Sequence, residues 1–487
     1  MKNFSPKNSK IFESILLSPN HNEQIVTIIC QALKSCLPST YQRINKILTS
    51  LIKNQKKELK KECYRGLPYD LPPLRALVWK INLKYLPADI NKWDITFKNM
   101  RKQYKEIKDA FLLRKMEELK IFEEIEINKN KSLLLLAQST DRILLETISK
   151  DINRTHVYFN FFSKTVDHKN HLTQNQLNEM LYAKANCVYQ NYKEVYTKDR
   201  NETHSDVLER ILYIYAKVNK DIGYVQGMNE ILAPIYYCYC LDNTCDLENV
   251  EADTFWSFSS LMDDIRDIYI KVNDNEKGGI FDKINLLELM ISKIQKDIFN
   301  LFKRKNVNFW HFAYRWIHLF FSQQFILPDL LRIWDTIFCE EDRYYFVYLF
   351  SLGILEYKKK DLLTKNFYEV IEELQSKKIT EIDKVISYTF DIKKNNENII
   401  NEILFFSGYK VNYIETDSIN NKKNTKLVSK NKIFHSKENK KDKKNDNIKN
   451  KRKFFLKENH KVNDINYNKT ATSIPHHFHL FGKQFEE

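Results

Sequence analysis

Two apolar segments of the chain are joined by Asp221-Ile-Gly-Tyr-Val-Gln-Gly-Met-Asn-Glu-Ile-Leu-Ala-Pro234. The sequence of 487 residues holds only 8 glycines, and two of them, Gly223 and Gly227, bracket Gln226. Because glycine allows positive φ and close approach of the backbone, this spacing predicts a shaped turn that presents Gln226. The alternative is a glutamine that only braces the turn, since one short motif is weak evidence.

The segments on either side of this turn have the pattern of helices. Before it, apolar residues recur at helical spacing, and these are Val207, Leu208, Ile211, Leu212, Tyr215 and Val218. After it, residues 231–241 are apolar nearly all round, as in a buried helix. No alternating pattern is long enough to build a sheet. The sequence therefore predicts an all-α fold.

A second motif lies upstream, where Ile148, Asp151 and Arg154 are spaced three apart on a predicted amphipathic helix over residues 141–155. This spacing lets the carboxylate of Asp151 face the guanidinium of Arg154. Such a partner would hold the planar fork of the arginine in one orientation. The alternative is an ordinary surface ion pair, which contributes little stability.

Shifts in composition divide the chain into three predicted parts. Residues 1–61 form a helical N-terminal extension, and a proline-rich stretch from Arg65 to Trp79 opens a domain over residues 62–410. That domain carries a charged helical insert at about residues 97–131, which we interpret as a solvated helix. Residues 411–487 are rich in Lys and Asn and poor in apolar residues, so they are predicted to be a disordered basic tail.

The net charge of +15 is concentrated in that tail. Residues 422–461 contain 16 Lys or Arg against 4 Asp or Glu, which accounts for +12 of the total. The nearly balanced body argues against a basic groove, so we do not expect nucleic acid as a partner. Clustered basic residues do attract anionic lipid, which makes the tail a candidate for contact with a membrane surface.

Cysteine usage and hydropathy bear on the compartment. The 8 cysteines form no Cys-x-x-Cys pair and lie mostly in apolar helical segments, which is typical of reduced thiols. The sequence begins without an apolar signal core, and no apolar run approaches the roughly 18 residues that span a bilayer. We expect a cytoplasmic protein, and its basic tail makes peripheral association with intracellular membranes a further expectation.

Several kinds of site are excluded because their motifs are missing. The sequence has no Gly-x-x-x-x-Gly-Lys-Ser/Thr phosphate loop, no Gly-x-Gly-x-x-Gly and no His-Glu-x-x-His. We therefore expect the chain itself to bind neither a nucleotide nor a catalytic metal.

Taken together, the motifs resemble those of the TBC-domain Rab GTPase-activating proteins. The stretch around Gln226 is similar to their glutamine-finger motif, and Ile148, Asp151 and Arg154 are similar to their arginine-finger motif. The opening from Arg65 to Trp79 and the stretch with Arg332, Trp334 and Asp335 follow in the family's order, so the resemblance covers about residues 65–390. The sequences of residues 223–230 and 322–329 most resemble those of the subgroup of the thirteenth human TBC1 member.

This resemblance implies a function and a set of site residues. It implies that Arg154 and Gln226 are catalytic fingers that act in trans on a Rab-family GTPase in its GTP form, in vesicle trafficking. The supporting residues that it implies are Asp151, Tyr224, Gly227 and Asn229. It implies no cofactor in this chain, because Mg²⁺ and GTP are carried by the partner GTPase.

Two alternatives to this function remain open at the level of the sequence. One is a catalytically idle scaffold that binds a Rab through the same fold. The other is a membrane adaptor whose activity lies in the basic tail.

Overall fold

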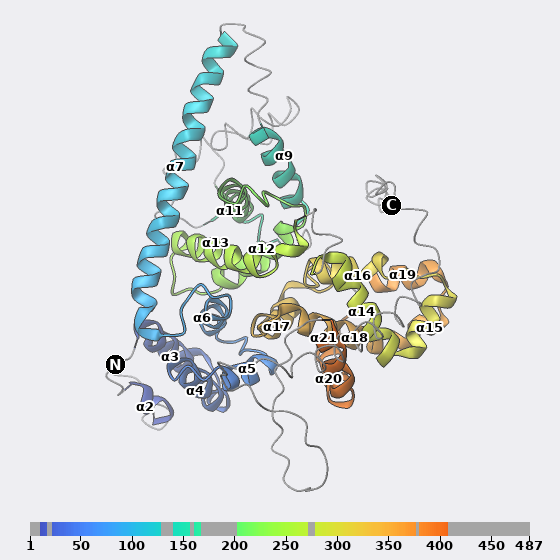
Figure 1. The fold of residues 1–487 in the computed structure, drawn as a ribbon. Coiled ribbons are helices and arrows are strands. Elements are labelled where there is room, and N and C mark those ends of the chain that lie inside the picture. The colour runs from blue at the N-terminus through green and yellow to red at the C-terminus, as the bar shows by residue number, and fades with distance from the viewer. Residues whose placement is uncertain are drawn as a thin grey trace, which may run out of the picture. The chain divides into compact units, whose positions relative to one another are not determined.

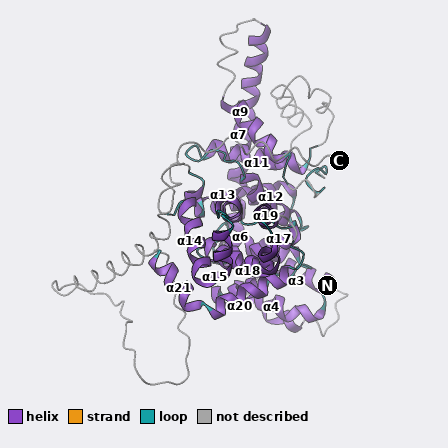
Figure 2. Ribbon diagram, turned by 90° about the vertical axis from the view of Figure 1, so that its right-hand side faces the viewer, coloured by secondary structure: helices purple, strands orange, loops and turns teal. Residues whose placement is uncertain are grey.

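The computed structural model describes residues 10–16, 22–127, 140–155, 160–166, 202–270, 278–375 and 379–407. Over these residues the chain consists of helices joined by turns and loops, without a strand (Figures 1 and 2). An isolated bridge joins Thr165 and Thr203. The all-α prediction is confirmed. The disorder predicted for residues 411–487 concerns residues outside the described ones, and the domain boundaries stay predictions.

The chain divides into two compact units. The first comprises Met1–Leu287 and Asp297–Ile392, and it holds every candidate site residue. The second comprises Glu288–Lys296 and Lys393–Glu487. Its described part includes the C-terminal half of α14, the end of α20 and all of α21.

The first half of the described chain contains the helices up to α9, the helix that precedes Arg154. They are η1 (Lys10–Phe12), α2 (Glu13–Leu16), α3 (Glu23–Ser35), α4 (Pro38–Ile52), α5 (Lys56–Tyr64), α6 (Pro72–Asn82), η2 (Ile90–Lys92), α7 (Trp93–Ile127) and α9 (Thr140–Ile152).

The second half contains the helices on either side of the Gln226 turn and those that follow it. They are α11 (His204–Val218), α12 (Met228–Cys240), α13 (Leu247–Asp264), η4 (Arg266–Ile268), α14 (Ile280–Ile294), α15 (Lys296–Arg304), α16 (Trp310–His318), α17 (Leu327–Phe338), α18 (Arg343–Thr364), α19 (Phe367–Gln375), α20 (Ile382–Asn395) and α21 (Glu397–Phe406). In the described part of the chain, no helix combines the length and the apolar character needed to cross a bilayer.

Local sequence explains where the site's helices begin. Thr203 and Asp206 form a capping box at the start of α11, in which each side chain accepts from the other residue's backbone N–H. At the start of α12 the N-cap is Gly227, with φ of 100°. Helix α11 packs against α9, α12 and α13, and α12 also contacts α9 (Figure 1), so the two predicted finger motifs lie on neighbouring elements.

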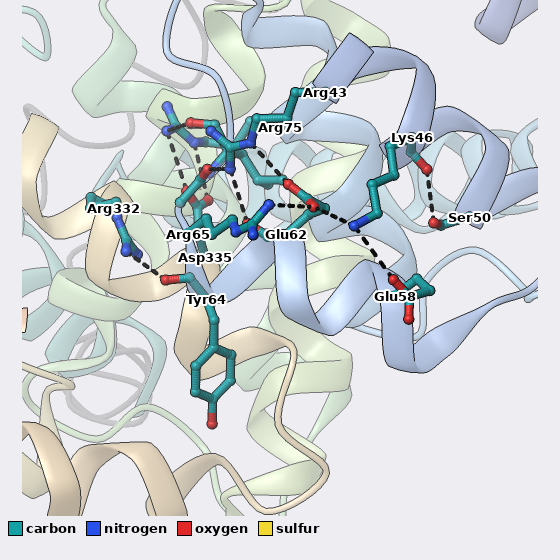
Figure 3. A network of polar contacts seen from close by, with 12 residues as sticks. Arg43, Lys46, Ser50, Glu58, Glu62, Tyr64, Arg65, Arg75, Arg332 and Asp335 are labelled. Carbon is teal, nitrogen blue, oxygen red and sulfur yellow. Dashed lines mark hydrogen bonds and ion pairs between the residues drawn. The ribbon is translucent and has the colours of Figure 1, made fainter. Parts of the chain in front are cut away.

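A buried carboxylate ties the proline-rich opening to the late helix α17. Asp335 is fully buried and accepts hydrogen bonds from the backbone N–H of Leu67 at 2.8 Å, from Trp79 Nε1 at 2.8 Å and from Arg75 Nε at 3.1 Å. Figure 3 shows Arg75 and Asp335 within a wider network that reaches Glu62 on α5 and Arg43 on α4. Since breaking a buried pair leaves an uncompensated charge, this network fixes α5, α6 and α17 together.

A second buried carboxylate anchors the base of α7. Asp253 on α13 accepts from Arg101 of α7 and from Tyr85, and it pairs with Lys80 of α6 at 2.8 Å. The long charged helix α7 is thus joined to the core through its N-terminal part. The charged helical insert predicted at about residues 97–131 corresponds to α7, which begins at Trp93. Tyr104 and Lys108 of α7 are buried, so the interpretation of the insert as a solvated helix is wrong for this part of it.

Candidate functional site

Arg154 lies two residues beyond the end of α9, on a tight turn. The helix predicted over residues 141–155 ends at Ile152, and the N–H groups of Arg154 and Thr155 donate to the carbonyls of Asp151 and Ile152 at 3.1 and 3.0 Å. The C-terminal end of a helix carries a partial negative charge and favours a cation. The guanidinium of Arg154 is therefore placed at a helix end that stabilises it, while 63% of its side chain is exposed.

Asp151 forms an ion pair with Arg154. Its side chain is only 5% exposed, and its Oδ1 accepts a charge-assisted hydrogen bond from Nη2 of Arg154. Nε of Arg154 also donates to the carbonyl of Lys150 at 3.3 Å. An arginine has five N–H donors, and these two contacts engage two of them, so the exposed edge of the fork can bind another group.

The same carboxylate reaches the turn that carries Gln226. The hydroxyl of Tyr224 donates to Oδ2 of Asp151 at 2.7 Å. Burial raises the pKa of the Tyr224 phenol well above its usual range, and the charge of Asp151 raises it further. Tyr224 therefore stays protonated and remains a donor to Asp151.

Asn229 completes the connection between α12 and the end of α9. Its amide Nδ2 donates to Oγ1 of Thr155 at 2.8 Å and to the carbonyl of Asp151 at 3.2 Å. Oγ1 of Thr155 in turn donates to that same carbonyl at 2.9 Å. Asn229 and Thr155 are both buried, so these hydrogen bonds are shielded from water.

The turn between α11 and α12 is shaped by its two glycines. Gly223 has φ of 63° and donates its N–H to the carbonyl of Asn219 at 2.7 Å, which closes the first half of the turn. Gly227 has φ of 100°, and a Cβ there would lie 2.8 Å from Cδ2 of Leu319. Only glycine fits this second position without displacing its neighbour. The side chain of Gln226, between them, is exposed.

Beneath Gly227 lies the end of α16. A Cβ on Gly227 would be 3.6 Å from Cε1 of His318, whose ring packs 4.4 Å from that of Tyr269. Burial lowers the pKa of the His318 imidazole to about 4. His318 is thus neutral near pH 7 and supports the turn by packing.

The structure brings four of the six sequence-predicted site residues into one hydrogen-bonded cluster, namely Asp151, Arg154, Tyr224 and Asn229. Gly227 starts the adjacent helix, and Gln226 is exposed on the turn beside Tyr224. Sequence reasoning missed Thr155 and His318. A threonine directly after the arginine was the one available signal for the first, and no sequence signal pointed to the second.

The cluster offers positioned donors. Among the described residues there is no group of three or more His, Cys, Asp or Glu side chains that could hold a metal ion. An exposed guanidinium and an exposed amide, both carried on braced turns, can donate hydrogen bonds to an anionic or polar group presented from outside.

Comparison with known proteins identifies the family. The model of the Rab-GTPase-TBC domain matches residues 188–363. Human TBC1 domain family member 13 is 30% identical over 367 residues, which span 68% of this chain and 92% of that protein. The chain belongs to the TBC-domain family.

Other TBC-domain proteins extend this similarity. The TBC domain-containing protein C1952.17c of Schizosaccharomyces pombe is 25% identical over 438 residues, covering 69% of this chain and 71% of that protein. The crystal structure of the Ypt/Rab-GAP domain of Gyp1p superposes with a TM-score of 0.50 at 20% identity, covering 71% of this chain and 98% of that one. This superposition supports the TBC fold, and the relationship to member 13 agrees with the subgroup that the sequence resembles.

Proposed function

We propose that this TBC-domain protein is a GTPase-activating protein for a Rab-family GTPase, and that Arg154 and Gln226 act as its two catalytic fingers. The observation that carries the proposal is the combination of exposure and support at Arg154. Its guanidinium is 63% exposed, yet it is held by a carboxylate that is only 5% exposed. The turn that carries Gln226 braces the same partner, because Tyr224 donates to the carboxylate of Asp151 and Asn229 donates to its carbonyl.

The chemistry of GTP hydrolysis calls for a group of this kind. Negative charge is spread over the phosphate oxygens in the transition state, and a cation supplied in trans stabilises it. For the general class this effect is worth about 10³ to 10⁵ in rate, which is roughly 4 to 7 kcal/mol of the barrier. Arg154 supplies that charge through N–H donors that its contacts with Asp151 and Lys150 leave available.

Holding the arginine in advance contributes to the rate. An arginine on a flexible loop loses rotamer freedom when it meets the phosphate, and that loss reduces the gain. Asp151 restricts the fork before the GTPase arrives, and Tyr224 and Asn229 restrict Asp151 and its backbone carbonyl. Preorganised donors of this kind cost little reorganisation during the reaction.

Gln226 positions the water that attacks the phosphate. Its amide can accept a hydrogen bond from the attacking water and donate another to the GTPase. The positive φ at both flanking glycines places this side chain on an exposed turn, where a partner can reach it. Mg²⁺ and GTP arrive with the GTPase, so this chain contributes positioning and charge.

The test is GTP hydrolysis by a panel of GTP-loaded Rab proteins with and without the protein, together with binding of each Rab to it. Acceleration of one or a few Rabs supports the proposal. Binding without acceleration favours an idle scaffold instead.

A further inference from the structure

A row of stacked aromatic rings runs along one face of α16. Trp310, Tyr314 and His318 are spaced four apart, so a helix places them on the same face. The ring centroids of Trp310 and Tyr314 are 5.7 Å apart with 26° between their planes, and those of Tyr314 and His318 are 5.0 Å apart with 12°. Phe281, at the start of α14, extends the row with its ring 4.4 Å from that of Trp310.

The two ends of this row differ in burial. His318 is 3% exposed and lies directly beneath Gly227, next to Gln226. Phe281 and Tyr314 are each 37% exposed, and Trp310 is half-buried. The row therefore starts under the turn that carries Gln226 and emerges as an apolar surface, which we call the aromatic face and define as Phe281, Trp310 and Tyr314.

The distance along α16 from His318 to the aromatic face is small compared with the size of a globular partner. Trp310 is eight residues from His318, which is on the order of 12 Å along a helix at 1.5 Å per residue. A globular domain of about 150 residues has a radius of gyration of about 15 Å, so its contact surface extends well beyond that distance. A GTPase seated on Arg154 and Gln226 thus has surface to cover this region.

The fingers also need additional contacts. A stable interface buries about 800 Å² on each partner, far more than two polar side chains supply. Aromatic residues are enriched among the few that dominate binding energy, because they bury a large area at low entropic cost. An aromatic row that is already stacked has little freedom left to lose.

We propose that the aromatic face is a docking surface for the GTPase, contacting an apolar patch beside the nucleotide site of the GTPase and contributing to the choice of Rab. The proposal rests on the proposed function, since the same partner occupies both the fingers and this face. It assigns Phe281, Trp310 and Tyr314 to binding and leaves the chemistry to Arg154 and Gln226.

The experiment uses the full-length protein and the Rab that it accelerates or binds best. The variants are Phe281→Ala and Tyr314→Ala, with Tyr314→Phe as the variant that keeps the ring. Tyr69→Ala is the matched control, because Tyr69 is a tyrosine that is 86% exposed in the loop before α6. Steady-state measurement gives KM and kcat of stimulated hydrolysis, and binding of the same Rab loaded with a non-hydrolysable GTP analogue gives Kd.

We expect Phe281→Ala and Tyr314→Ala each to raise KM and Kd about tenfold to thirtyfold, with kcat within about twofold of wild type. Tyr314→Phe and Tyr69→Ala should stay close to wild type. An unchanged kcat also shows that the fold and the fingers are intact in the variants.

Other outcomes separate this proposal from the proposed function. If a Rab is accelerated and the two alanine variants keep wild-type KM and Kd, the docking surface is wrong and the activity stands. If a Rab is bound without acceleration, the docking surface is tested by Kd alone: a higher Kd for the two alanine variants supports it, and a wild-type Kd contradicts it. If the wild-type protein neither binds nor accelerates any Rab, both proposals fall.

Discussion

The hydroxyl of Tyr224 donates to Oδ2 of Asp151 across 2.7 Å. These two residues are 73 positions apart in the chain: Tyr224 lies on the turn that carries Gln226, and Asp151 lies at the end of α9, just before the turn that carries Arg154. Because the other oxygen of Asp151 accepts from Arg154, one carboxylate connects both turns. The position of one finger therefore depends on the position of the other.

Removing the hydroxyl tests this connection. Tyr224→Phe takes a donor from a buried carboxylate, which typically costs about 1.5 to 3 kcal/mol of stability for a hydrogen bond to a charged group. We expect the free energy of unfolding to fall by that amount in a urea titration. We also expect stimulated GTP hydrolysis to slow by about tenfold, since Asp151 is then less restrained under Arg154.

A matched control separates the two effects. Tyr85 donates to the buried Asp253 at 2.7 Å, the same distance as in the Tyr224 pair, but that carboxylate serves α6, α7 and α13. Tyr85→Phe should lower stability to a similar extent and leave the hydrolysis rate unchanged. Equal losses of rate in the two variants would mean that Tyr224 acts through stability alone.

The two glycines of the turn should respond differently to alanine. The left-handed backbone at Gly227 destabilises an alanine by about 1 to 2 kcal/mol. The new Cβ would also lie 2.8 Å from Leu319, and this overpacking lowers the free energy of unfolding by about 1 to 3 kcal/mol more. Gly223→Ala meets the backbone cost alone, because no atom lies within 4 Å of its Cβ position. We expect Gly227→Ala to be clearly the less stable variant and to lose more of the stimulated hydrolysis. Urea unfolding and the hydrolysis assay test the order, and a reversed order contradicts it.

A buried ion pair away from the fingers sets part of the acid sensitivity. Burial raises the pKa of the Glu373 carboxyl, but hydrogen bonds from Lys358 and Lys365 outweigh it and lower the pKa to about 2. A carboxyl with a lowered pKa stabilises the fold above its unfolded value of about 4.5, and that stabilisation is lost as pH falls towards 2. The contribution at pH 7 is a few kcal/mol.

Glu373→Gln should remove this contribution. We expect the variant to be less stable than wild type at pH 7, because Lys358 is 3% exposed and loses its charged partner. We also expect its free energy of unfolding to fall less between pH 5 and pH 2 than that of wild type. Glu381→Gln, at an exposed pair with Lys384, is the control and should change little. Urea unfolding at several pH values makes the measurement, and parallel curves for Glu373→Gln and wild type would contradict the assignment.

Local patterns were sufficient to predict the helices around the site. The apolar spacing before and after residues 219–227 predicted α11 and α12, and the scarcity of glycine marked the turn between them. The three-residue spacing of Asp151 and Arg154 predicted their pairing, which the structure contains. Each of these features depends on neighbours within one or two turns, which is the range that a periodic pattern describes.

Contacts between distant segments could not be predicted in the same way. The resemblance named Tyr224 and Asn229 as supporting residues, but no spacing indicates that they meet Asp151 and Thr155 more than 70 positions away. The packing of His318 under Gly227 likewise depends on how α16 and α12 are placed. The end of α9 at Ile152, three residues before the predicted end, is a boundary that apolar periodicity does not mark.

The most direct test of the account is the single-turnover rate of GTP hydrolysis by the most responsive Rab, with wild-type protein, Arg154→Ala and Arg154→Lys side by side. Binding of the same Rab is measured in parallel. We predict that both variants still bind and both lose about 10³-fold or more of the stimulated rate, because lysine keeps the charge and loses the planar fork. A lysine variant close to the wild-type rate, or an alanine variant that still accelerates hydrolysis, would contradict the assignment of Arg154 as the finger.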